Sequence, residues 1–145
     1  METTKNLEDE YKWALETAAA VRAGNFQAVD REALVNELER SVAGGFRRQL
    51  HQYTRDTLRA RLSLKLAPNS DREENVDLFR RALDRMGSLL RACPSLRDVV
   101  TEEFVADAYE SAKYVIGDEI PLPEHCPYSA EQILKEAQTF DVGEL

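Results

Sequence analysis

His125 and Cys126 stand next to each other near the C-terminal end of the chain, and their types suggest chemistry. A cysteine beside a histidine can be an activated nucleophile, or both residues can bind a metal. Neighbours in sequence point in divergent directions, however, and a zinc site needs three or four protein ligands at workable spacing. Only His51 and Cys93 remain to complete such a site. We therefore predict no metal site and no cofactor, and we interpret Cys126 as filling a gap in the core.

An acidic segment offers a second set of candidates. Glu32, Asn36 and Arg40 fall on one helix face at positions i, i+4 and i+8, with Glu37 and Glu39 beside them. Carboxylates inside a helical bundle can bind metals, but such sites typically add a Glu-x-x-His pair, which this sequence lacks. The segment is interpreted as a solvated helix face.

A basic stripe is the third candidate, because residues 40–65 hold seven basic side chains and one acidic one. Such a stripe is the electrostatic footprint of nucleic-acid binding, but the whole chain has a pI of about 4.9 and shows no helix-turn-helix signature. Residues 101–145 hold eleven acidic side chains, so pairing with Glu102, Glu103, Asp107 or Glu110 would satisfy the stripe internally. Internal pairing, a protein partner and, as the least expected, nucleic acid all stay open. The candidate binding patch consists of Arg48, His51, Arg55 and Arg59.

The elements that must position these residues are predicted to be helices, because apolar residues recur at spacings of three and four. A first helix is expected over residues 7–23, ended by Gly24. Its predicted buried face consists of Tyr11, Ala14, Leu15, Ala18 and Val21, with Trp13 as a further member. A long second helix is expected from Arg31 to Ala67, capped by Asp30 and ended by Pro68, with a bend at Gly44-Gly45. Its predicted buried stripe consists of Leu34, Leu38, Val42, Phe46, Leu50, Tyr53 and Leu58.

Three more helices are expected after Pro68. Capping boxes are predicted at Ser70 with Glu73, at Ser95 with Asp98 and at Ser129 with Gln132. The apolar seam of the third helix consists of Val76, Phe79, Leu83, Met86, Leu90 and Cys93. The fourth helical region spans residues 96–116, with a joint at 101–103, and Gly117 ends it. Its inward residues are Leu96, Val99, Val100, Phe104, Ala108, Ala112 and Val115. A Pro-rich strap over residues 122–128 leads to a final helix that ends near Ala137.

The bulk properties indicate one soluble domain over residues 1–145, with an ordered core over 6–137 and a frayed tail over 138–145. Hydrophobic residues make up 43% and charged residues 32% of the chain, which is typical of a globular domain. No secretion signal and no apolar run of about 20 residues is visible, so we expect no membrane association. Two cysteines without a redox or metal spacing favour reduced thiols and a cytoplasmic location.

Four segments, taken in order, resemble the bacterial family called domain of unknown function 29. They are residues 13–17 (Trp-Ala-Leu-Glu-Thr) with 21–24 (Val-Arg-Ala-Gly), residues 30–39, residues 94–97 (Pro-Ser-Leu-Arg), and residues 122–129 with Ile133-Leu134. The chain departs from the family pattern at Asn36-Glu37, where two acids are usual, and at residues 61–65, where a His-Leu-Leu-Lys stretch is usual. The resemblance implies an all-α single domain and no known activity, cofactor or catalytic residue.

The sequence thus predicts an all-α, single-domain helical bundle of about five helices, with a bent long second helix and a Pro-rich C-terminal strap. No phosphate loop, nucleophile elbow or His-Glu-x-x-His helix occurs, and a non-enzymatic role is favoured. The leading hypothesis is a small interaction or regulatory domain that binds another protein or a second copy of itself. The alternatives are a hydrolase-like enzyme using Glu37 with His125 or Cys126, and nucleic-acid binding through the basic helix face.

Overall fold

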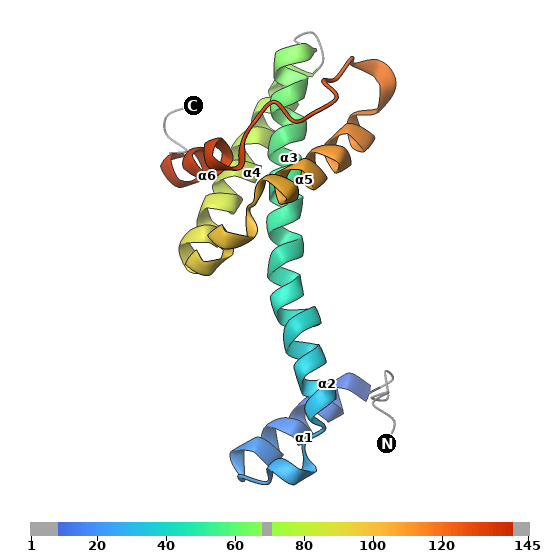
Figure 1. The fold of residues 1–145 in the computed structure, drawn as a ribbon, viewed down its shortest axis with the longest axis vertical. Helices are drawn as coiled ribbons and strands as arrows, with labels where there is room; N and C mark the ends of the chain where they lie inside the picture. The colour runs from blue at the N-terminus through green and yellow to red at the C-terminus, as the bar shows by residue number, and fades with distance from the viewer. Residues whose placement is uncertain (1–8, 68–70, 141–145) are drawn as a thin grey trace. The chain divides into compact units, whose positions relative to one another are not determined.

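The structure, a computed structural model, describes residues 9–67 and 71–140 (Figure 1). Within these ranges the chain forms helices and contains no β-strand, which confirms the all-α class. The α-helices are α1 (Glu10–Arg22), α2 (Arg31–Asn36), α3 (Gly44–Leu66), α4 (Arg72–Ala92), α5 (Glu102–Ile116) and α6 (Ala130–Thr139). Shorter helical segments are η2 (Phe26–Ala28), η3 (Glu37–Ala43), η4 (Pro94–Val99) and η5 (Gly117–Glu119).

The chain divides into two compact units, Met1–Phe46 and Arg47–Leu145. The N-terminal unit holds α1, η2, α2, η3 and the first three residues of α3, and the C-terminal unit holds everything that follows. Each unit is described by itself below. The prediction of a single domain over residues 1–145 stays a prediction.

The predicted second helix corresponds to α2, η3 and α3, which together keep residues 31–66 helical. Its middle part, η3, is π-helical, a rare form that interrupts the regular α-helical hydrogen bonding. The chain does not break at Gly44-Gly45, where α3 begins directly after the π segment. The predicted bend at this point stays a prediction.

Local signals place most of the helix ends. Asp30 Oδ1 accepts the Ala33 N–H at 3.1 Å and caps α2 as predicted. Gly24 and Gly117 adopt positive φ angles of 73° and 79°, which glycine tolerates best, directly after α1 and α5. At α6 both halves of the predicted capping box are present, since Ser129 bonds the Gln132 N–H and the Gln132 side chain accepts the Ser129 N–H.

Two predicted caps are corrected. Ser70 lies outside the described residues, and α4 is capped by Asp71, whose carboxylate accepts the Glu74 N–H at 3.3 Å. Ser95 does not open an α-helix, because residues 94–99 form the 3₁₀ segment η4. Thr101 caps α5 instead, which confirms the predicted joint. The frayed tail predicted over 138–145 is wrong at its start, because α6 extends to Thr139, and residues 141–145 lie outside the described residues.

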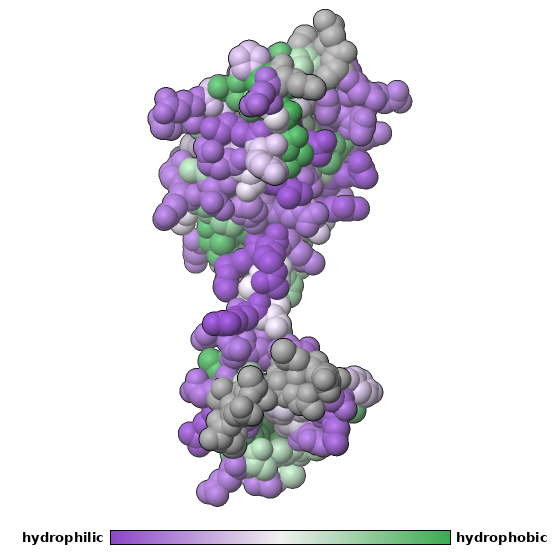
Figure 2. Space-filling view, turned by 90° about the vertical axis from the view of Figure 1, so that its right-hand side faces the viewer, coloured by the Kyte–Doolittle hydropathy of each residue, from purple (hydrophilic) through white to green (hydrophobic). Residues whose placement is uncertain are grey.

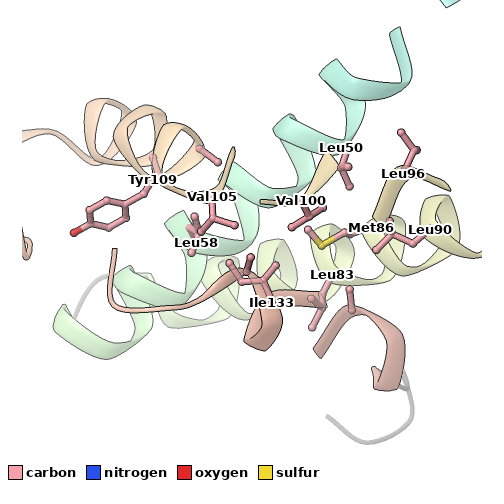
Figure 3. Close-up of a cluster of buried hydrophobic side chains, with 14 of the residues drawn as sticks. Leu50, Leu58, Leu83, Met86, Leu90, Leu96, Val100, Val105, Tyr109 and Ile133 are labelled. Atoms are coloured by element: carbon pink, nitrogen blue, oxygen red, sulfur yellow. The ribbon is translucent and has the colours of Figure 1, made fainter. Parts of the chain in front are cut away.

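The C-terminal unit contains the hydrophobic core, which α3, α4, α5 and α6 enclose together with η4 (Figure 3). Most of the predicted inward residues of these helices are buried or half-buried, whereas Val115 is exposed. Helices α4 and α6 meet closely at Gly87, where an added Cβ would lie 2.5 Å from the carbonyl oxygen of Ala137. The buried apolar cluster consists of Leu50, Leu58, Leu62, Leu83, Met86, Leu90, Leu96, Val100, Val105, Ala108, Tyr109, Ala112, Ala130, Ile133 and Ala137.

The N-terminal unit differs, because α1 has no buried residue at all. Five of the predicted inward residues of α1 are exposed, and only the further member, Trp13, is half-buried, together with Thr17 and Ala20 on the same side of the helix. The predicted burial of Leu38, Val42 and Phe46 is also wrong, since all three are exposed. The only buried hydrophobic side chain among the described residues of this unit is Ala33.

Candidate functional site

The most distinctive surface of the described chain is a set of exposed apolar side chains in the N-terminal unit, here called the N-terminal apolar surface. Figure 2 shows apolar side chains, in green, at the surface of this unit. The surface consists of Tyr11, Leu15, Val21, Phe26, Val35, Leu38, Val42 and Phe46. Their exposed fractions run from 39% at Phe46 to 77% at Tyr11. Soluble monomers rarely leave large contiguous apolar patches in water, and such patches usually mark interaction sites.

Helical spacing organises this surface into two stripes. On α1, Tyr11 and Leu15 lie one turn apart, and the exposed Ala14 and Ala18 fill the same face. Over α2, η3 and the start of α3, the members follow at steps of three, four and four: Val35, Leu38, Val42 and Phe46. Phe26 lies on η2, between the two stripes in sequence. Leu38, Val42 and Phe46 belong to the predicted stripe but face water, whereas Leu34, its first predicted member, is half-buried and the exposed Val35 stands beside it.

The predicted basic patch lies on α3, in the C-terminal unit, along the edge of that helix's buried face. His51 Nε2 lies 3.0 Å from Asp107 Oδ2 of α5, and its ring packs edge-on against Phe104. Arg55 Nη2 lies 3.1 Å from Asp56 Oδ1. The internal pairing expected between this stripe and the acidic segment is therefore present at His51.

The other two patch residues have different surroundings. Arg48 is exposed, whereas Arg59 is half-buried and lines a cleft together with Asp71 and Glu74. The four residues thus share one helix, and His51 and Arg55 each lie within hydrogen-bonding distance of a carboxylate oxygen. Their role as a binding patch stays a prediction.

The candidate nucleophile Cys126 lines a cleft of about 510 Å³ beside α5, with His125 and five carboxylates. These carboxylates are Glu102, Glu103, Asp107, Glu110 and Glu124. Burial raises the pKa of the Cys126 thiol, and the negative charge of Glu102 adds to this rise. The thiol donates a hydrogen bond to the Tyr128 carbonyl oxygen at 3.4 Å, which also favours its protonated form. An acidic, desolvating environment keeps the sulfur protonated, which is the unreactive form.

Glu37, the carboxylate considered together with this pair, belongs to the N-terminal unit. Every residue that lines the Cys126 cleft comes from the C-terminal unit. His125 is exposed at the rim. The environment of Cys126 therefore offers no activation of the thiol.

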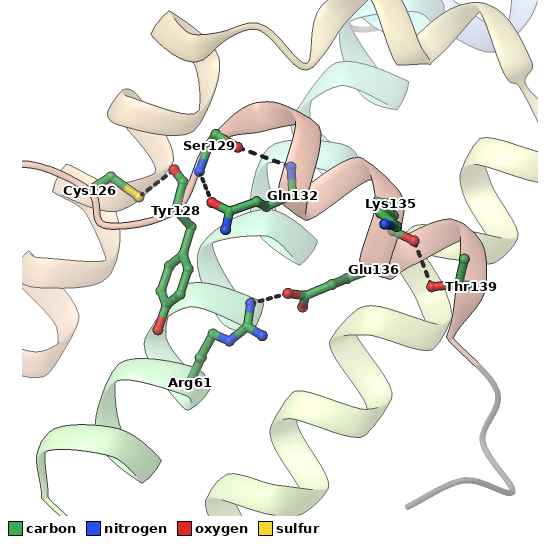
Figure 4. A network of polar contacts seen from close by, with 8 residues as sticks. All are labelled: Arg61, Cys126, Tyr128, Ser129, Gln132, Lys135, Glu136 and Thr139. Carbon is green, nitrogen blue, oxygen red and sulfur yellow. Dashed lines mark hydrogen bonds and ion pairs between the residues drawn. The ribbon is translucent and has the colours of Figure 1, made fainter.

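Polar contacts hold the segment around Cys126 against the core (Figure 4). Arg61 Nη1 lies 2.6 Å from Glu136 Oε1, and the guanidinium stacks on the Tyr128 ring at 4.5 Å from its centroid. Tyr109, buried in α5, donates its hydroxyl to the Pro123 carbonyl. A carboxylate oxygen of Glu102 accepts the Ala130 N–H at 2.9 Å. These contacts give the residues near Cys126 a structural role.

Sequence reasoning missed Tyr109 and Arg61 as the residues that hold this segment. The sequence places Arg61 in the basic stripe over residues 40–65. No residue near it in sequence indicates that it pairs with Glu136 of α6. Tyr109 lies on the same helical face as Ala108 and Ala112, within reach of periodicity, but a tyrosine is often only half-buried.

The N-terminal unit contains a further cleft, which carboxylates line. In the N-terminal unit, Glu32, Asn36 and Glu39 line a cleft of about 360 Å³ with Ala33 and Val35. Over residues 9–67 and 71–140, no group of three or more His, Cys, Asp or Glu side chains is arranged to hold a metal ion. In the same ranges, none of the helices combines the length and the apolar character that crossing a bilayer requires.

Comparison with known proteins gives one match. The family model described as domain of unknown function DUF29 matches residues 7–138, which is most of the chain. No curated protein and no solved structure matches this chain.

Proposed function

The chain belongs to the DUF29 family, a domain of unknown function, and we propose that it is a small interaction domain that acts by binding another protein. The observation that carries this proposal is the N-terminal apolar surface. Eight large apolar side chains in one unit are held in water at 39–77% exposure. Exposing them costs free energy, at about 25 cal/mol for each Å² of apolar area, and a protein partner would recover it.

The composition of this surface supports a protein partner rather than a small molecule. Tyr11, Phe26 and Phe46 are large aromatic residues, a class enriched in protein interfaces, where buried aromatic anchors carry much of the binding energy. The stripes follow helices, a geometry that suits helix-on-helix packing. A cytoplasmic location fits the free thiols of Cys93 and Cys126 and is part of the same proposal.

The basic patch on α3 is proposed as an accessory contact. Arg48 is exposed there, and charged groups at the rim of an interface steer association and partner choice more than they raise affinity. The enzymatic alternative is not favoured, because the half-buried thiol of Cys126 has a raised pKa and makes a structural hydrogen bond.

The test is partner capture from the native host with three proteins: the wild type, Tyr11→Gln/Val35→Gln, and the matched control Tyr114→Gln/Val115→Gln. The two pairs have the same residue types, and Val35 and Val115 are both 45% exposed. A captured protein that is lost only in the first variant supports the proposal. Capture that both variants retain fully would argue against this surface.

A second variant, Arg48→Glu/Arg55→Glu/Arg59→Glu, tests the accessory patch. We expect it to slow association and to make binding less sensitive to salt. If it released a nucleic acid instead of a protein, the nucleic-acid hypothesis would replace this one.

A further inference from the structure

We propose that the C-terminal unit binds a small aliphatic α-amino acid in a cleft of about 290 Å³ that α3, α4 and the end of α5 line. Every residue that lines this cleft comes from the C-terminal unit, so the inference goes beyond the proposed role of the N-terminal apolar surface. Three features of the lining carry it: two unpaired hydrogen-bond donors, a set of charges of both signs, and a group of aliphatic side chains.

The hydroxyl of Ser63 is the first feature. Ser63 is only 9% exposed and lines the cleft from α3. Within the described part of the chain its hydroxyl makes no hydrogen bond, whereas the two other buried hydroxyls of α3, on Thr54 and Thr57, bond main-chain carbonyls. Buried polar groups nearly always have a partner, because an unpaired one has lost its hydrogen bonds to water. A ligand in the cleft would supply the partner that this hydroxyl lacks.

Arg59 is the second donor without a partner. It lies four residues before Ser63, on the same face of α3, and is half-buried in the same cleft. Among the described residues its guanidinium has no ion-pair partner, whereas Arg55 and Arg61 of the same helix each pair with a carboxylate. A guanidinium and a hydroxyl both donate hydrogen bonds, and a carboxylate accepts from both. The two side chains therefore suit the carboxylate of a ligand.

The other charged groups of the lining indicate a second charge on the ligand. Asp71 and Glu74 line the cleft from the start of α4, and Arg81 adds a second guanidinium from the same helix. The two carboxylates would repel a dianion such as phosphate, and the two guanidinium groups would repel a simple cation. An ammonium group donates to carboxylates, and a carboxylate accepts from guanidinium groups. The zwitterion of an α-amino acid meets both requirements.

Aliphatic side chains form the rest of the binding surface. Leu78 of α4, Val115 and Ile116 of α5, and Ile120 line the cleft beside the charged groups. Small-molecule sites are typically apolar, with a few polar groups that fix the orientation of the ligand. Their volumes begin at about 300 Å³, so this cleft suits a ligand of amino-acid size rather than a nucleotide. The aliphatic lining favours leucine, isoleucine or valine over amino acids with polar side chains.

The experiment is isothermal titration calorimetry of the full chain with L-leucine, L-isoleucine and L-valine. We expect saturable binding with a dissociation constant below about 1 mM for at least one of them. Two analogues of leucine test its two charges, since isocaproate lacks the ammonium group and isoamylamine lacks the carboxylate. Each should bind at least about tenfold more weakly than leucine, because charged groups of the cleft are then left without a partner. L-Glutamate should also bind at least about tenfold more weakly, because its side chain brings a charge to the aliphatic lining.

Variants test the two donors. Arg59→Gln and Ser63→Ala should each weaken leucine binding about tenfold or more. The matched control is Arg55→Gln, at another half-buried arginine of α3 that does not line the cleft, and it should leave binding unchanged. Arg59→Gln should weaken the binding of leucine more than that of isoamylamine, which has no carboxylate for Arg59 to bind. A general disturbance of the cleft would instead weaken both ligands equally.

Three results would overturn the inference. The first is a wild-type chain that binds none of the three amino acids up to about 10 mM. The second is an analogue, isocaproate or isoamylamine, that binds as tightly as leucine. The third is a control Arg55→Gln that loses binding as fully as Arg59→Gln. None of these results affects the proposed function, because partner capture through the N-terminal apolar surface does not depend on this cleft.

Discussion

In the C-terminal unit, Leu58 and Leu62 of α3 lie one helical turn apart and are both buried. In the N-terminal unit, Leu38 and Val42 of η3 also lie four residues apart, and both are about half exposed. The apolar spacing runs through the whole helical stretch 31–66, but only one end of it has neighbours that exclude water. The C-terminal end packs against α4, α5 and α6, whereas the N-terminal unit buries one hydrophobic residue, Ala33, among those described.

This contrast teaches that helical periodicity identifies an apolar face but does not identify what packs on it. In the C-terminal unit the packing partners come from the same chain. In the N-terminal unit we propose that a protein partner supplies them. The contrast can be tested by perturbing each unit separately.

The largest effect is expected from truncating leucines in the two units. Leu58→Ala should lower the unfolding free energy of the C-terminal unit by about 2–5 kcal/mol, because it leaves a cavity in a packed core. Leu38→Ala, at a position that is 52% exposed, should leave the C-terminal unit unchanged. Hydrogen exchange of α4 and α5 amides measures both. Equal losses of unfolding free energy from the two variants would show that the two leucines do not differ in packing.

The next effect sharpens the claim that the C-terminal unit is closely packed by its own helices. Gly87→Ala should destabilise it by about 1–3 kcal/mol, because the new Cβ would lie 2.5 Å from the Ala137 carbonyl oxygen. The loss should exceed the gain of about 1 kcal/mol in helix propensity. Thermal unfolding measures this loss of stability, with Ser88→Ala, at the exposed neighbouring position, as the control variant. A stabilised Gly87→Ala would mean that α4 and α6 do not meet this closely.

A smaller effect separates two serines that look alike in sequence. Ser129→Ala should lower the free energy of unfolding by about 1 kcal/mol, because it removes the side chain that caps the first turn of α6. Ser95→Ala should change stability by less than about 0.5 kcal/mol, since η4 has no side-chain cap. Chemical denaturation of both variants measures these changes in the free energy of unfolding. A larger loss from Ser95→Ala would contradict the assignment of caps.

The smallest effect is a pH dependence confined to the C-terminal unit. Burial raises the pKa of the Cys126 thiol in the folded chain, while an unfolded thiol ionises near pH 8.5. The folded state then holds its proton more tightly, so stability is full below about pH 8.5 and decreases as pH rises above it. Burial raises the pKa of Tyr109 and Tyr128 as well, which extends the decrease above about pH 10. Cys126→Ala should lessen the decrease between about pH 8.5 and 10, as urea midpoints at several pH values would reveal. A wild-type midpoint that is constant from pH 7 to 10 would contradict the prediction.

Much of the fold could be predicted from the sequence because helix ends are local. Asp30, Gly24, Gly117 and Ser129 act on backbone groups within a few residues of themselves, and each does what its type predicts. The π segment before Gly44 could not be predicted, because it depends on a hydrogen-bonding register that no single residue type specifies.

The candidate sites were harder to predict, because they depend on contacts between distant residues. The spacing of Arg48, Arg55 and Arg59 correctly placed a basic stripe on a helix. The Asp107 carboxylate beside His51, however, lies 56 residues further along the chain, and only the packing of α5 brings it there. The exposure of Tyr11 was unpredictable for the same reason, since spacing identifies an apolar face but not the residues that pack on it.

The most direct measurement is hydrogen exchange of α1 and α5 amides in the free chain and in the presence of a captured partner protein. If a partner protein covers the N-terminal apolar surface, protection in α1 will rise when the partner is added, while protection in α5 stays constant. Protection in α1 that is strong in the free chain and unchanged by the partner would contradict the account.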